Sequence, residues 1–169
     1  MTSKKFKPTQ DTPVVGDTPE AKKLQEGFRR LGEVDSGRPI ADTIREHGTA
    51  IHFGPLEPDT VAQFDPQTNE STVSEGLKET SPNILAAHLA HEGTHVQWVR
   101  DGKGFNTEDE IVNAEYAALK NQADVWNEVK GTEIDEQCDD VAAIMALGED
   151  EAKDLIRLMY QEEIRQRRK

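Results

Sequence analysis

Apolar residues recur at helical spacing along much of this chain, and one stretch, residues 81–100, is apolar on nearly every side. Ser81 suits the N-cap of a helix, and Pro82 suits its first turn, where proline's missing N–H costs nothing. The apolar positions of the stretch are Ile84, Leu85, Ala87, Leu89, Val96, Trp98 and Val99. Because a helix that is apolar on most sides is typically buried, this pattern predicts a buried helix around which the rest of the chain is organised.

Shorter patterns on both sides of this stretch predict the other elements. Helices are expected over residues 18–32 and 39–48, short strands over residues 50–53, 61–64 and 71–74, a hairpin turn over residues 65–70, and further helices over residues 107–129, 131–148 and 150–168. Thr107 and Glu110 have the spacing of a capping box at the start of the longest of these helices. We therefore expect an α+β fold, mostly helical, in which a small antiparallel sheet is followed by the buried helix, a second long helix and two C-terminal helices.

Length and composition indicate one domain with an acidic surface. The chain has 169 residues, of which residues 17–169 are expected to form a single domain and residues 1–16 a disordered arm. The net charge of −13 repels nucleic acids and anionic membranes, so neither is expected as a partner. No signal peptide or membrane-spanning run is visible, and the single cysteine, Cys138, cannot form a disulfide within the chain. We therefore expect a cytoplasmic protein.

Histidine and glutamate interrupt the buried helix at its middle. The segment from His91 to His95 fits the pattern H-E-x-x-H, with Glu92 as its second residue. Two histidines four positions apart lie one above the other on a helix face, so both imidazoles can bind one Zn²⁺. Glu92 points about a third of a turn away and can reach a water at the metal without being a ligand itself. This spacing predicts a zinc site with a neighbouring general base.

The motif, together with the order of the elements, resembles the gluzincin class of zinc metallopeptidases in its minimal, single-domain form. The resemblance implies a third zinc ligand, a glutamate on the helix that follows the H-E-x-x-H helix, and Glu115 stands at that place. Helix geometry favours the same residue over Glu110. Glu115 lies about 12 Å along the returning helix, level with the histidines, whereas Glu110 lies only about 4.5 Å along it and belongs to the capping box.

The resemblance is to the class and identifies no subfamily. Gluzincins of the thermolysin type often carry asparagine just before the ligand glutamate and aspartate four residues after it, but Ala114 and Leu119 occupy these positions here. The partner that orients a ligand histidine is therefore expected elsewhere, at Asp124 or Asn113.

Several other residues are candidates for roles near the metal. A peptidase needs a donor for the oxygen of the scissile carbonyl, and His52, Tyr116 and Tyr160 are left open for this role. His88, one turn before the motif, is expected to be a hydrogen-bonded histidine of the core or the rim, since three successive histidines on one helix splay away from a single ion. Gly93 is less favourable than alanine in a helix by about 1 kcal/mol, and the close approach of a neighbouring strand would account for it.

These observations predict a zinc-dependent metallopeptidase acting on a peptide or protein, with oligomeric state undetermined. His91, His95 and Glu115 would hold Zn²⁺, and Glu92 would act as general base. The substrate is expected to add as a strand along residues 71–74, taken as an exposed edge. The alternative is a zinc-containing regulatory or binding module that acts through protein contacts without turnover.

Overall fold

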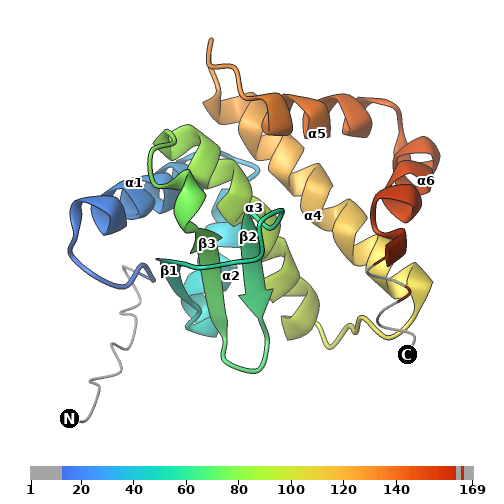
Figure 1. The fold of residues 1–169 in the computed structure, drawn as a ribbon, viewed down its shortest axis with the longest axis horizontal. Coiled ribbons are helices and arrows are strands. Elements are labelled where there is room, and N and C mark those ends of the chain that lie inside the picture. Colours follow the sequence, from blue (N-terminus) through green and yellow to red (C-terminus); the bar gives the residue numbers. More distant parts are fainter. Residues whose placement is uncertain (1–12, 163–164, 166–169) are drawn as a thin grey trace.

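The computed structural model describes residues 13–162 and residue 165, and Figure 1 shows their arrangement. The elements run in the order α1 (Pro19–Glu33), α2 (Arg38–His47), β1 (Ala50–Gly54), β2 (Ala62–Asp65), β3 (Glu70–Ser74), a 3-10 helix (Glu75–Leu77), α3 (Pro82–Arg100), α4 (Glu108–Val129), α5 (Glu136–Ala146) and α6 (Glu149–Met159). The predicted α+β, mostly helical fold is confirmed. Within the described residues, no helix is both long enough and apolar enough to cross a membrane.

Helix α3 is the buried centre of the molecule, as its sequence predicts. It contacts α1, α2 and α4 and also meets β2. The Ser81 side chain accepts a hydrogen bond from the backbone N–H of Ile84 and so caps the helix. Leu85 and Leu89 pack into the main core with side chains from α1, α2 and the sheet.

Gly93 marks the closest approach of α3 to α2. A Cβ at this position would lie 2.3 Å from Cγ2 of Ile40 and 2.8 Å from Cδ1 of Ile44. The neighbour that requires a glycine is therefore a helix, and the expectation of a neighbouring strand is wrong.

The sheet is mixed, with strand order β1-β3-β2. Strands β2 and β3 are antiparallel and form the expected hairpin, but β1 runs parallel to β3, so the prediction of an antiparallel sheet is wrong for this pair. The reason is the connection over residues 55–61, which crosses the end of β3. Gly54 of β1 pairs with Ser74 on one side of β3, and Ala62 of β2 pairs with Val73 on the other side. Strand β3 is therefore central, and Val73 is fully buried, which overturns the prediction that residues 71–74 form an exposed edge.

The first described residues continue the sheet on the side of β1. Val14 forms a parallel bridge with Ile51, whose N–H donates to the carbonyl of Pro13. Val14 is also 5% exposed and belongs to the main core. Residues 13–16, part of the predicted disordered arm, are thus ordered, because Val14 pairs with β1 and packs into the core. Residues 1–12 of the arm lie outside the described residues.

The C-terminal half forms a second layer against α3. Thr107 caps α4 by accepting the N–H of Glu110, and the Glu110 carboxylate accepts the N–H of Asn106. Helix α5 begins later than predicted, because Asp135 is its N-cap and accepts the N–H of Cys138. Ile134, expected inside that helix, is 85% exposed. Helix α6 ends at Met159, and residues 163–164 and 166–169 of the predicted last helix lie outside the described part.

Candidate metal centre

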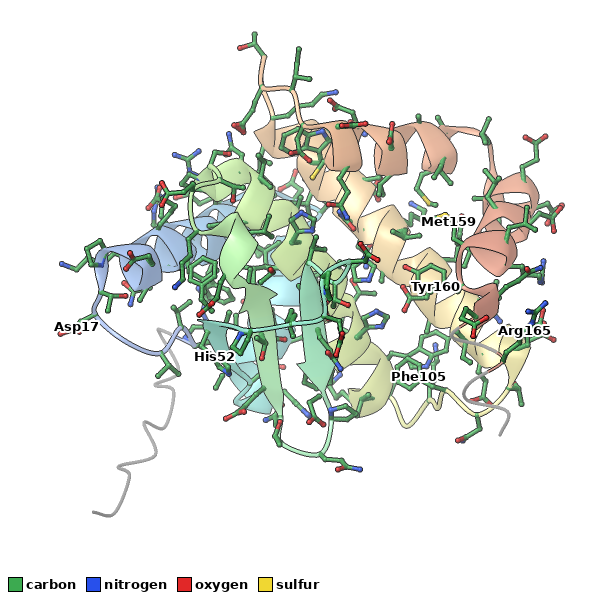
Figure 2. All side chains as sticks on the ribbon, viewed as in Figure 1. Asp17, His52, Phe105, Met159, Tyr160 and Arg165 are labelled. Carbon is green, nitrogen blue, oxygen red and sulfur yellow. The ribbon has the colours of Figure 1, made fainter. Side chains whose placement is uncertain are left out.

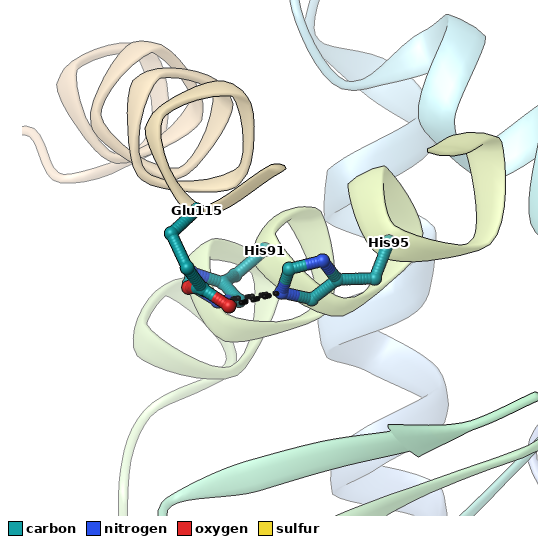
Figure 3. A group of neighbouring side chains, drawn as sticks. All are labelled: His91, His95 and Glu115. Carbon is teal, nitrogen blue, oxygen red and sulfur yellow. Dashed lines mark hydrogen bonds and ion pairs between the residues drawn. The ribbon is translucent and has the colours of Figure 1, made fainter. Parts of the chain in front are cut away.

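Helices α3 and α4 bring the side chains of His91, His95 and Glu115 to one point (Figure 3). The Nε2 atoms of the two histidines are 3.2 Å apart. The Glu115 carboxylate places one oxygen 3.2 Å from Nε2 of His95 and the other 3.3 Å from Nε2 of His91. The side chains are 11–15% exposed, so the group is largely withdrawn from water.

These separations fit a tetrahedral metal ion. Ligands bound at about 2.0–2.1 Å with tetrahedral angles are separated from each other by roughly 3.3–3.4 Å. The two histidine nitrogens are 3.2 Å apart, and a different oxygen of Glu115 lies 3.2–3.3 Å from each of them. With one ligand atom taken from each residue, the three atoms lie within 4.8 Å of one another. Two nitrogens and a carboxylate also form a donor set that zinc accepts. In addition, Oε2 of Glu115 is buried without a hydrogen-bond partner among the described residues, as expected for an oxygen that faces a cation.

The charges of the group reinforce each other. Burial disfavours the charged form of His91, but the hydrogen bond and charge of Glu115 and the charge of Glu92 outweigh it and raise the pKa of His91 to about 9. Burial likewise acts against ionised Glu115, yet the close approach of both imidazoles holds the pKa of this carboxyl well below its usual range. Glu115 is therefore a buried anion between two imidazoles, an environment that favours a cation.

Gln122 is the partner that orients His91, one of the candidate ligands. It lies on α4, is 3% exposed, and its Oε1 is 3.0 Å from Nδ1 of His91. This contact holds the ring while Nε2 faces Glu115 and His95. The two predicted partners do not take this role: Asn113 is exposed, and Asp124 pairs with Lys120. Glutamine was not anticipated because the expected pattern contained only aspartate and asparagine.

Glu92 lies beside the ligand group without joining it. Its side chain lines a cleft with a volume of about 470 Å³ and is 5% exposed. Among the described residues it has no hydrogen-bond or ion-pair partner, so its carboxylate is free to act on a molecule that enters the cleft. The structure thus leaves Glu92 outside the group of possible metal ligands.

The cleft has two different walls. Residues 59–64 and Pro66, which include the first three residues of β2, form one wall, and Leu119, Val141 and Tyr160 belong to the opposite one. Strand β2 pairs only with β3 in the described part of the chain, so its other edge is open. The edge strand beside the candidate metal centre is therefore β2.

Only one of the three candidate donors lies at the cleft. Tyr160, at the end of α6, lines it, and Figure 2 shows this residue near Phe105, whose ring contacts that of His95 at 5.9 Å. His52 lies on β1, away from this group, and its Nε2 is 3.9 Å from Glu70. Tyr116 does not line the cleft and packs beneath the ammonium of Lys153.

His88 is a histidine of the cleft, and the expected hydrogen bond of its ring is not found among the described residues. It is 3% exposed, lines the cleft and lies outside the group of possible ligands. Cys138 is also outside that group, and burial raises the pKa of its thiol, which keeps it protonated. The helical spacing of residues 88, 91 and 95 was the available signal that His88 shares the metal-facing side.

Comparisons with protein families, curated proteins and solved structures find no match to this chain. The class of the protein therefore has to be argued from the geometry of the site.

Proposed function

We propose that this protein is a zinc-dependent metallopeptidase. The observation that carries the proposal is the meeting of His91, His95 and Glu115 within reach of one ion, with Glu92 beside them in an open cleft. A purely structural zinc site has no need of such an acid or of space for a further molecule, because its ion is closed off by protein ligands.

Different residues of the cleft would carry out different steps of peptide hydrolysis. A zinc ion at the group would supply a Lewis acid that polarises the scissile carbonyl and lowers the pKa of water. Glu92 takes a proton from the attacking water as the new C–O bond forms, and returns it to the leaving amine as the C–N bond breaks. Tyr160, which lines the cleft, is the residue we expect to donate a hydrogen bond to the carbonyl oxygen, where negative charge develops. Gln122 keeps His91 in its orientation.

The open edge of β2 is the place where we expect the substrate. An edge strand presents unpaired N–H and C=O groups, which hydrogen-bond to an extended peptide of almost any sequence. Such a peptide would pass between β2 and the wall that contains Tyr160. The proposal therefore moves the binding strand from residues 71–74 to β2. We expect the protein to work in a reducing compartment such as the cytoplasm, because its single cysteine, Cys138, is a buried free thiol.

The test separates zinc binding from catalysis. Metal analysis of the purified protein should give close to one zinc per chain, and a random peptide library should be cleaved. Glu92→Gln should keep the zinc and lose most turnover, whereas His91→Ala and His95→Ala should lose the metal. If the parent binds zinc but cleaves nothing, the protein is a binding module. If Glu92→Gln cleaves as fast as the parent, the general base lies elsewhere.

A further inference from the structure

His88 is a largely buried histidine whose ring makes no hydrogen bond to another described residue. It is 3% exposed, and its ring borders the same cleft as Glu92, together with Gln137. The buried side-chain atoms that lack a hydrogen-bond partner in the described part of the chain are Nδ1 of His95 and Oε2 of Glu115. The ring nitrogens of His88 are therefore not closed off from the cleft. An imidazole that lines a cleft and hydrogen-bonds to no described residue is available to a molecule that enters it.

The ring of His88 is outside the metal centre and carries no charge near neutral pH. The ligand group among the described residues consists of His91, His95 and Glu115 alone. Burial, with the nearby charge of His91, lowers the pKa of His88 to about 4, against a smaller opposing effect of Asp135. A neutral imidazole offers one N–H donor and one nitrogen acceptor, which matches the peptide main chain.

The position of His88 along α3 fixes which part of a substrate it can meet. Strand β2 runs broadly along α3 in both Figure 1 and Figure 3, so a peptide added to β2 also follows this helix. His88 is three residues from His91, or about 4.5 Å along the axis. An extended peptide advances about 3.3 Å per residue.

We propose that His88 is a substrate-binding residue that hydrogen-bonds to the main chain of the peptide one to two residues from the cleaved bond. This inference rests on the proposed peptidase function. It assigns His88 to binding and leaves proton transfer to Glu92, so its loss should weaken binding of the substrate more than it slows the chemical step.

The direct test measures peptide binding without turnover. In a zinc-loaded Glu92→Gln background, the peptide that the library assay selects is titrated by calorimetry. Adding His88→Phe, which keeps a ring but removes the hydrogen-bonding nitrogens, should weaken binding about tenfold, the loss expected for one unpaired hydrogen bond. His52→Phe is the matched control, because this histidine lies outside the cleft, and should leave the affinity unchanged.

Three further measurements keep the inference open to refutation. With Glu92 intact, His88→Phe should raise KM about tenfold and change kcat less than twofold, and His88→Gln, which keeps a donor and an acceptor, should recover part of the loss. Where phenylalanine cannot be accommodated, His88→Leu removes the same hydrogen bond.

Unchanged peptide affinity in a folded variant would overturn the inference, as would loss of zinc, which would make His88 a ligand. If Glu92→Gln binds no library peptide, the proposed function falls and the role of His88 falls with it.

Discussion

Replacement of Gly93 by alanine tests whether α3 is pressed against α2 behind the metal centre. Carbon atoms in good contact are about 3.5–4.0 Å apart, whereas the new Cβ would lie 2.3 Å from Cγ2 of Ile40. A change in the Ile40 side chain alone cannot relieve this overlap, so one helix must move away from the other. Overpacking of this kind costs about 1–3 kcal/mol, and alanine recovers up to about 1 kcal/mol through its helix propensity. We expect a net loss of roughly 1–2 kcal/mol.

Thermal unfolding followed by circular dichroism measures this loss. For a domain of this size the melting temperature should fall by about 2–8 °C. Gly32→Ala is the matched control, because its Cβ would meet only ordinary contacts, at 3.6 Å from Ala41 and 3.8 Å from Arg45, and it should not destabilise. In an Ile40→Ala background, Gly93→Ala should lose most of its effect. An unchanged or higher melting temperature for Gly93→Ala alone would show that α2 and α3 are not in this contact.

The remaining predictions concern the metal centre and its surroundings. Glu115→Ala should lower zinc affinity at least tenfold in a chelator competition, while Glu110→Ala should keep the metal and lose only about 1 kcal/mol of capping stability; the reverse result would refute the ligand assignment. Gln122→Leu keeps the side-chain volume but removes the acceptor at His91, and should weaken zinc binding about 10–100-fold; unchanged affinity would leave that contact without a role. Chelator-stripped protein should lose up to roughly 3 kcal/mol of stability as the pH falls from 6.5 to 4. In this range His88 takes up a proton in the unfolded chain but stays neutral in the folded protein. In urea titrations across this range, His88→Phe should lower the slope of stability against pH, and an unchanged slope would contradict the buried, neutral state of this ring.

Local signals were sufficient for α3 and for the placement of Glu115. The apolar period, the Ser81 cap and the spacing of the motif all depend on residues within one helix, so they could be interpreted without tertiary information. Glu115 could be placed beside His95 because a short connection forces the next helix to return along the first, and helix rise then sets the height of each residue.

Features that depend on pairing between distant segments could not be predicted in the same way. The apolar run of β1 has no property that specifies its direction, so its parallel pairing with β3 had no local signal. Gln122 has the expected place on the packing face of α4, but its contact with His91 depends on how α4 crosses α3. The start of α5 was misplaced because Gly131 and Thr132 resemble a helix start, while the actual cap is Asp135.

The three candidate ligands all come from one helical hairpin, residues 82–129, and this bears on the order in which the molecule folds. The contacts between α3 and α4 close a shorter loop than the one that brings Tyr160, at the end of α6, to the cleft, and a shorter loop costs less entropy to close. The hairpin can therefore bring the three candidate ligands together before α6 adds Tyr160. On the proposed function, a chain in which α6 is not yet folded would already hold the ligand group but would lack the tyrosine expected to assist hydrolysis.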